Sequence, residues 1–401
     1  MDRAPALDAV RGCAALAIVV LHVWLYTTTA AEKGDSVLDG VVHQFRLGVP
    51  LFFCLSGFLL YRAWVTAVRD GGALPRIAEY ARRRAWRIVP AYGLALVGSL
   101  ALLVPFSDVR GVDVPEAQYL ALFLVFASNL HSATNGALDP PMWTLAVEVQ
   151  FYVVLPLVAA LVLSRTPVRL RPALLIVPPA LLLAAGIAFN VVAAGRPANL
   201  VVANSLPALV PCFAAGMAAA VVFGSGLLRS RWVSAALLAG GAGLVVLNGI
   251  WHEGNAGVAG RIWRDLPAAV GFAAIVLVAA RPTTSRVLHS RSVRALGDLS
   301  FPMYLWHMPV MLGLRGFGLF PEGRPVAALA VVLAVTIPVS WASWTLLERP
   351  ALRFSAARAR RRVPVAVPAV PAVRGVPAAA AIAAPAARPA VRRPAADAAA
   401  A

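Results

Sequence analysis

Two ionisable residues, Arg11 and His22, stand eleven positions apart in an otherwise apolar stretch, RGCAALAIVVLH. Eleven residues turn an α-helix to within about 20° of its starting direction, so the two side chains share one face about 16 Å apart. A guanidinium binds anionic oxygens, and an imidazole exchanges a proton near neutral pH. The pattern predicts a helix face with an anion-binding end and a proton-transferring end. For Arg11 the alternative is an ordinary topology signal at the inner end of a first membrane helix.

A carboxylate suited to partner His22 occurs in MWTLAVEVQFY, where Glu148 lies about one and a half turns into a predicted helix. In a hydrocarbon core about 30 Å thick, the predicted helix starts place Glu148 and His22 at nearly the same depth, in the outer half. A carboxylate bonded to one ring nitrogen raises the basicity of the other, which suits general-base catalysis. We expect His22 and Glu148 to form a catalytic pair. The alternative is a structural ion pair or a packing histidine.

A second cationic group lies in ARRRAWRIVPAY, where Arg83, Arg84 and Arg87 precede or begin a predicted span. Guanidinium groups bind phosphate oxygens through two parallel hydrogen bonds. With Arg11, this cluster is predicted to hold the diphosphate and 3'-phosphate of a coenzyme A carrier. Anionic lipid headgroups are the alternative ligand for the same arginines.

Two further polar residues, Tyr304 and His307, are bracketed by prolines in GDLSFPMYLWHMP. They are three positions apart and therefore share a helix face. A helix that starts near residue 299 places His307 in the inner half of the membrane, too deep to contact His22 directly. Contact with an acyl donor and a structural hydrogen bond are both open for His307. Glu348 lies near the inner end of the last predicted span.

The composition indicates that these residues lie in a membrane. Of the 401 residues, 60% are hydrophobic and 13% are charged, and the mean hydropathy is +0.77. These values predict an all-α, polytopic integral membrane bundle rather than a soluble protein. The formal charge of +18 comes from arginines between apolar runs, a distribution typical of topology signals rather than of nucleic-acid binding. The three cysteines have no paired spacing, so we expect neither disulfides nor a metal site.

About ten apolar runs are long enough to span a bilayer. They lie near residues 10–29, 46–64, 88–106, 143–163, 173–194, 205–223, 232–250, 266–280, 299–319 and 326–347. The excess of arginine in alternate connections predicts that both termini are cytoplasmic, with the chain in the inner (plasma) membrane. The shorter run 118–131 is expected to be re-entrant or interfacial. We predict a membrane domain over 1–355 and a disordered Ala/Pro/Arg-rich tail over 356–401.

Six motifs, in the order RGCAALAIVVLH, FFCLSGFLL, RRRAWRIVPAY, WTLAVEVQFY, LSFPMYLWH and LLERP, resemble the membrane-bound acyltransferase 3 family of bacterial O-acyltransferases. The resemblance covers residues 3 to 353. It implies transfer of an acyl group, usually acetyl, from cytoplasmic acyl-CoA to a hydroxyl of a carbohydrate or glycosylated acceptor. Phe301 departs from the family's usual tyrosine, and Thr144 replaces a common serine.

The resemblance and the residue chemistry together give an expected set of site residues. We expect His22 and Glu148 to be catalytic, without a metal. The residues expected to contact acyl-CoA are Arg11, Arg83, Arg84, Arg87, Tyr304, His307 and Glu348. A transporter or flippase of an acidic or lipid-linked substrate is the competing class, because it also uses intramembrane charges.

Overall fold

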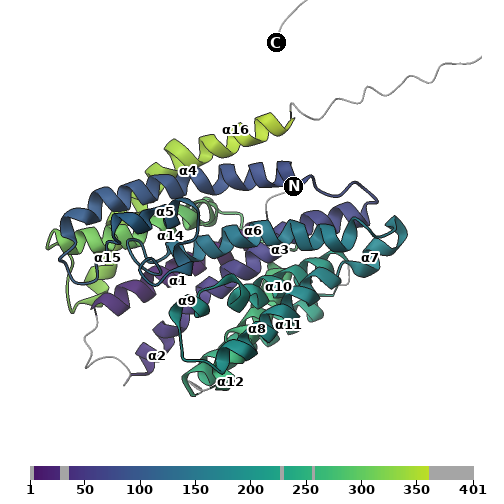
Figure 1. Ribbon diagram of the computed structural model, residues 1–401, viewed down its shortest axis with the longest axis horizontal. Helices are drawn as coiled ribbons and strands as arrows, with labels where there is room; N and C mark the ends of the chain where they lie inside the picture. The colour runs from purple at the N-terminus through teal and green to yellow at the C-terminus, as the bar shows by residue number, and fades with distance from the viewer. Residues whose placement is uncertain (1–3, 28–35, 226–229, 255–257, 361–401) are drawn as a thin grey trace, which may run out of the picture. The chain divides into compact units, whose positions relative to one another are not determined.

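The computed structural model describes residues 4–27, 36–225, 230–254 and 258–360, and every regular element in them is a helix (Figure 1). In hydrocarbon, backbone N–H and C=O groups must be bonded within the protein, and a helix bonds all but those at its ends. Nine helical segments of these ranges are long and apolar enough to cross a membrane. The prediction of an all-α polytopic membrane bundle is confirmed.

The long helices are α1 (Pro5–Thr27), α3 (Gly48–Arg69), α4 (Ile77–Leu103), α6 (Met142–Leu163), α8 (Val177–Ala194), α10 (Leu206–Gly224), α11 (Arg231–Gly254), α13 (Leu266–Ala279), α14 (Arg291–Gly316) and α15 (Pro325–Ser343). The shorter α-helices are α2 (Val37–His43), α5 (Leu120–Leu124), α7 (Arg171–Leu174), α9 (Leu200–Ala203), α12 (Val258–Trp263) and α16 (Arg349–Arg360). Single turns of 3₁₀-helix are η1 (Gln44–Leu47), η2 (Val104–Phe106), η3 (Ala117–Tyr119), η4 (Ser128–Leu130) and η5 (Val168–Leu170), and η6 (Trp344–Glu348) is a π-helix.

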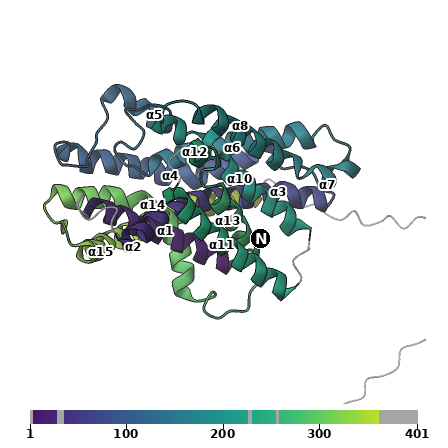
Figure 2. The same cartoon turned by 90° about the horizontal axis from the view of Figure 1, so that it is seen from below.

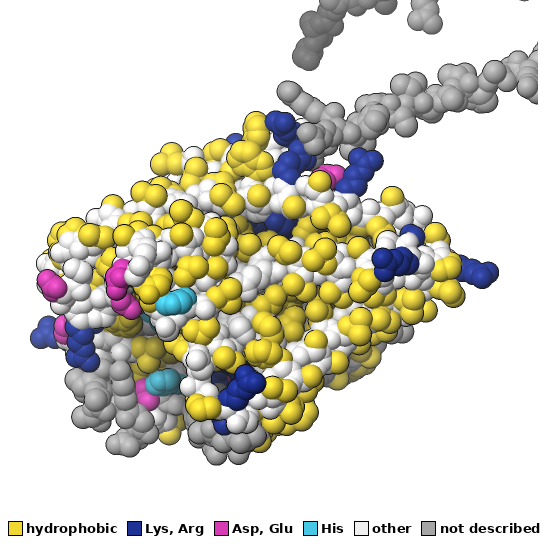
Figure 3. Space-filling model, viewed as in Figure 1, with side chains coloured by type: hydrophobic (Ala, Val, Ile, Leu, Met, Phe, Trp, Pro, Cys, Tyr) yellow, Lys and Arg dark blue, Asp and Glu magenta, His cyan; other side chains and the backbone are white. Residues whose placement is uncertain are grey.

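Nine of the predicted spans coincide with the nine apolar segments, and the tenth coincides with α14. Helix α14 has 26 residues, but its prolines, arginines and histidine make it less apolar than the others. The run 118–131 forms only η3, α5 and η4, so it contains no spanning helix. Where the chain is described, the surface in Figure 3 is covered mainly by hydrophobic side chains, as lipid contact requires.

Helices α3 and α10 pack at unusually short distance because glycines face each other's backbone. A Cβ atom at Gly57 would lie 2.1 Å from the carbonyl oxygen of Phe213, and one at Gly216 would lie 1.9 Å from that of Cys54. Gly216 faces Cys54 and Gly224 faces Val65 and Arg69, so the two helices run parallel. Small residues are the usual means of close helix association in lipid, where apolar burial drives association little.

Helices α1 and α14 lie side by side and run parallel (Figures 1 and 2). Gly12 faces Leu296, and Gly297 faces Asp8, so the two helices start in register. The register places residues near 22 of α1 beside residues near 307 of α14. This pairing positions the histidines described below.

Two hydrophobic clusters form the interior. One is built mainly on α3, α6, α10 and α13, and the other mainly on α1, α4 and α14. Phe53 and Leu60 belong to the first cluster, whereas Ile88 and Leu145 belong to the second, and all four line one cavity. The polar residues of the site therefore lie at the boundary between the two clusters.

Internal contacts divide the chain into the units Met1–Arg358 and Ala359–Ala401. Residues 356–360 of the predicted tail are helical, because α16 continues to Arg360. From 361 onward the tail lies outside the described residues, so its disorder stays a prediction, as does the domain boundary at 355.

The glycine contact between α3 and α10 gives a test of the packing. Gly216→Ala is expected to destabilise the protein by about 1–3 kcal/mol, because the added methyl forces backbone apart. Gly240→Ala in α11 is the matched control, since a Cβ there meets nothing within 4 Å and alanine favours helix by about 1 kcal/mol. Thermal unfolding of the purified protein measures both. Equal unfolding midpoints for the two variants would contradict the packing argument.

Candidate active site

A buried pair of histidines joins α1 and α14. The Nδ1 atom of His22 lies 2.9 Å from Nε2 of His307, and their rings stack with centroids 5.0 Å apart. Nδ1 of His307 lies 3.1 Å from the carbonyl oxygen of Met303. A carbonyl only accepts, so in the neutral pair His307 donates through Nδ1 and accepts through Nε2 from His22. Nε2 of His22 is then left unprotonated, with a lone pair for a proton.

The predicted pairing of His22 with Glu148 is wrong, and so is the predicted separation of His22 from His307. Helix α14 begins at Arg291 rather than near 299, which moves His307 about 12 Å further along the helix. His307 is thus the seventeenth residue of α14, level with His22, the eighteenth residue of α1. Glu148 has the predicted place in its own helix, but α6 packs against α3, α4, α8 and α10. Its neighbours are therefore other residues.

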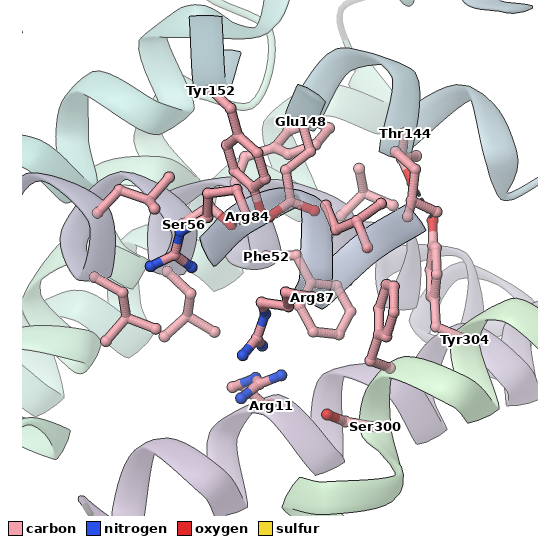
Figure 4. Close-up of a pocket in the computed structure, with 18 residues that line it drawn as sticks. Arg11, Phe52, Ser56, Arg84, Arg87, Thr144, Glu148, Tyr152, Ser300 and Tyr304 are labelled. Atoms are coloured by element: carbon pink, nitrogen blue, oxygen red, sulfur yellow. Dashed lines mark hydrogen bonds between the residues drawn. The ribbon is translucent and has the colours of Figure 1, made fainter. Parts of the chain in front are cut away.

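Glu148 lies instead in a cavity of about 290 Å³ together with three arginines (Figure 4). Arg11 enters it from α1, and Arg84 and Arg87 enter it from α4. Figure 4 shows the guanidinium groups of Arg11 and Arg87 beside each other. The other polar lining residues are Ser56, Thr144, Tyr152, Ser300 and Tyr304.

The carboxylate of Glu148 is fixed by two hydroxyl groups. Ser56 Oγ donates to Glu148 Oε1 at 2.5 Å, and Tyr152 Oη donates to the same oxygen at 2.7 Å. The guanidinium of Arg84 lies over the Tyr152 ring, 5.9 Å from its centroid. One carboxylate thus faces three guanidinium groups, so the cavity has a net positive charge. Charges removed from water are stable only with partners of opposite sign, so this cavity suits an anionic ligand.

A second cavity, of about 260 Å³, adjoins the first and shares Arg11, Arg87 and Phe301 with it. Glu348 lines this second cavity, where it accepts a hydrogen bond from Ser343 Oγ at 3.1 Å. Glu348 ends the π-helix η6. A π-turn inserted between α-helices is frequent at functional sites, and here it turns Glu348 toward the arginines.

Arg83 is not part of this site. Its side chain is 57% exposed and pairs with Glu79 on the same helix. Successive helix residues point about 100° apart, so Arg83 cannot share the direction of Arg84. The structure therefore gathers Arg11, Arg84, Arg87, Glu148 and Tyr304 around one cavity and leaves Arg83 at the surface.

Tyr304 connects the cavity to the histidine pair. Its hydroxyl lies 2.8 Å from Thr144 Oγ1, and its ring centroid is 5.9 Å from that of His307. Neither His22 nor His307 lines the arginine cavity, but Tyr304 and Ser300 precede His307 along one face of α14. The histidines thus lie about one turn beyond the cavity wall.

Three polar residues of this region were not predicted as site residues. Ser56 and Tyr152 both donate to Glu148, and the position of Tyr152 four residues after Glu148 indicates a shared helix face. Asp139 precedes α6 and is 1% exposed, and no hydrogen-bond partner of its carboxylate is found among the described residues. Burial raises the pKa of Asp139 well above its ordinary value, which favours the neutral acid.

The described residues contain no group of three or more His, Cys, Asp or Glu side chains arranged to hold a metal ion. The fold and the site define a multi-pass membrane protein with a buried histidine pair beside a cationic cavity. The family model described as an acyltransferase domain, the acyltransferase 3 model, matches residues 5–345. The chain belongs to this family and is an acyl-transferring enzyme. Membership in this family favours the enzyme over the transporter.

Several curated relatives are similar along most of the chain. The exopolysaccharide production protein ExoZ of Rhizobium meliloti is 32% identical over 79% of this chain and 93% of its own length. The acyltransferase MdmB of Streptomyces mycarofaciens is 27% identical over 92% of this chain and 96% of its own. The O-acetyltransferase OatA of Staphylococcus aureus is 21% identical over 86% of this chain and 57% of its own. No solved structure matches the chain significantly.

The carboxylate of Glu148 gives a test of the charge balance in the arginine cavity. Glu148→Gln keeps the shape but removes the carboxylate that lines the cavity with the three arginines, so we expect destabilisation by about 3 kcal/mol. Added sulfate is expected to restore part of the loss. Glu322→Gln removes a carboxylate that is 53% exposed and pairs with Arg315, and a loss below about 1 kcal/mol is expected there. Thermal unfolding compares the two variants, and a Glu148 variant no less stable than the control would refute the balance.

Proposed function

We propose that the protein is a membrane O-acyltransferase that moves an acyl group, acetyl in the simplest case, from acyl-CoA to a hydroxyl of a carbohydrate or glycosylated acceptor. The observation that carries the proposal is the histidine pair, whose free nitrogen on His22 lies beyond a cavity rich in arginine. The names of two relatives, an O-acetyltransferase and an exopolysaccharide production protein, support the same class of reaction.

The donor is assigned to the arginine cavity and its neighbour. Coenzyme A carries a diphosphate and a 3'-phosphate, and the net positive charge of Arg11, Arg84 and Arg87 is balanced when these groups bind. Arg11 and Arg87 line both cavities, so one carrier can contact both. Because Asp8, Asp298 and Glu348 also line the second cavity, the phosphates are assigned to the first. Glu148, bonded to Ser56 and Tyr152, supplies negative charge beside the arginines rather than acting on His22.

The acceptor hydroxyl is assigned to the side of His22. Nε2 of His22 takes the hydroxyl proton while the oxygen attacks the thioester carbon. The carbon–sulfur bond then breaks, and the imidazolium returns the proton to the leaving thiolate. His307, held by the Met303 carbonyl, keeps His22 in the tautomer whose Nε2 is free.

The orientation of the chain follows from the donor. With both termini in the cytoplasm, the arginine cavity opens toward cytoplasmic acyl-CoA, and the connections after α8 and α11 face outward. The distribution of arginine between the connections supports this orientation in the plasma membrane.

The consecutive residues Arg83 and Arg84 give a matched test of donor binding. Arg84→Gln is expected to raise the KM for acetyl-CoA at least about tenfold, the weight of one charge-assisted hydrogen bond. Arg83→Gln removes the same charge one position away and is expected to change KM less than twofold. Steady-state release of coenzyme A measures both. Equal changes in KM for the two variants would mean that Arg84 does not contact the donor directly and contributes no more than the general positive charge of this region.

The histidine pair gives a test of the chemistry. His22→Ala is expected to lower kcat by about 10²–10⁴-fold through loss of the base. His307→Ala is expected to lower kcat less, and the double variant is expected to match His22→Ala, because residues acting as one unit are not additive. Labelled acetyl-CoA with a glycan acceptor reports transfer. Substrate flux without thioester cleavage would instead identify a transporter.

A further inference from the structure

Another cavity in the described part of the chain lies apart from the site above. It has a volume of about 470 Å³ and shares no lining residue with either arginine-lined cavity near Glu148. Its walls come from the end of α8, the connection 195–199, α9, α12 and Arg46 of η1. In Figure 3, basic side chains (dark blue) gather over the region where Figure 1 places α8, α9 and α12.

This cavity, called the outer cavity from here on, is strongly basic. Arg46, Arg261 and Arg264 line it, and none of the lining residues whose side chains the structure describes carries a carboxylate. Asp265 lies behind the wall, where it pairs with Arg46 Nη1 at 2.7 Å and lies 3.8 Å from Arg264 Nε. Three guanidinium groups against one carboxylate leave an excess of positive charge, as in the arginine cavity.

The arginines are held in place but not saturated. Arg261 Nη1 donates to the carbonyl of Arg196 at 2.7 Å, and Arg264 Nη1 donates to that of Ala203 at 2.8 Å. Arg46 Nη2 and Arg261 Nε are buried and have no hydrogen-bond partner among the described residues. Buried N–H donors are almost always paired in native proteins. Fixed guanidinium groups with spare donors are the usual arrangement for binding a carboxylate or phosphate.

The outer cavity lies close to the arginine cavity and to the helix that carries His22. Arg46 precedes Val49 by three positions along η1 and α3, and Val49 lines the arginine cavity. The two cavities therefore approach within about one helical turn. The turn η1 also packs against α1, the helix of His22. A sugar bound in the outer cavity can extend the rest of its chain toward the histidine pair.

We propose that the outer cavity binds an anionic oxygen group, a carboxylate or a phosphate, of the carbohydrate acceptor. The proposal rests on the proposed function, because it assigns the acceptor side of that reaction. A volume of about 470 Å³ lies within the range of small-molecule sites, about 300–1,000 Å³, and accommodates one charged sugar unit. An acidic acceptor would thus be preferred over a neutral one of equal length.

The test measures binding without an acyl donor, on the full chain in phosphatidylcholine nanodiscs. The probes are a glucuronate-containing oligosaccharide, a sugar phosphate and a neutral glucose oligosaccharide. The two acidic probes are expected to bind at least about tenfold more tightly than the neutral one. Equal affinity for all three would overturn the proposal.

Variants then assign the binding to the cavity. The double variant Arg261→Gln, Arg264→Gln is expected to bind the acidic probes at least about tenfold more weakly, and Arg261→Lys is expected to retain most of the affinity. Arg196→Gln is the matched control. The side chain of Arg196 is exposed, and only its backbone carbonyl contacts Arg261, so an unchanged affinity is expected. Undiminished binding by the double variant would overturn the proposal. If the double variant does not fold, the single variant Arg261→Gln replaces it. This variant is expected to bind the acidic probes at least about threefold more weakly.

Two further measurements are needed. One distinguishes a carbohydrate anion from a lipid headgroup, and the other distinguishes the anion site from the proposed acyltransferase function. Phosphatidylglycerol added to the nanodisc is expected to leave probe affinity unchanged, and tenfold weaker binding there would reassign the cavity to lipid headgroups. Transfer to the neutral acceptor is expected to persist in the double variant. Absence of transfer by the wild-type protein to any acceptor would refute the proposed function, while the binding result would still decide the anion site.

Discussion

The hydrogen bond between His22 and His307 constrains the rest of the site. It requires α1 and α14 to run parallel, in register and close together, which the contacts of Gly12 and Gly297 permit. Because the Met303 carbonyl accepts from His307, the direction of donation along the pair is fixed. The tautomer of His22 is thus set by neutral groups of one helix rather than by a carboxylate, the usual orienting partner. A shift of either helix by one turn, about 5.4 Å, would remove the contact.

The location of the cavity follows from the packing around this helix pair. α3 and α10 are drawn together by their glycines and form the core of one hydrophobic cluster, whereas α1, α4 and α14 form the other. Polar side chains cannot face lipid without a large penalty. The boundary between two clusters is then the place where arginines, hydroxyls and a carboxylate can meet one another while apolar faces still cover both sides. Arg11 and Glu148 reach this boundary from different clusters of helices.

Much of the architecture was predictable from the sequence, because hydrophobic runs and arginine spacing are local properties. The ten helices and the residues Arg11, Arg84, Arg87 and Glu148 follow from them. Two kinds of information were missing. The start of α14 was placed too late because its first two turns carry Arg291, Arg294 and Asp298, and this error alone separated His307 from His22. The lateral neighbours of α6 cannot be derived from depth, so Glu148 was assigned to the wrong partner. Arg83 differed from Arg84 only by rotation about the helix axis.

The two parts of the site divide charged groups from neutral ones. Around Glu148, the side chains are ionic and suit a ligand that brings its own negative charge. His22 is bonded to His307, whose ring lies near that of Tyr304, and burial raises the pKa of Asp139 well above its ordinary value. A carboxylate at His22 would hold the imidazolium and lower its tendency to return a proton to the leaving group, and it would attract the arginines across apolar surroundings. Orientation of His22 by the neutral His307 and the Met303 carbonyl avoids both effects. This arrangement orients the base without a hydrogen bond from either histidine to a charged side chain of the described residues.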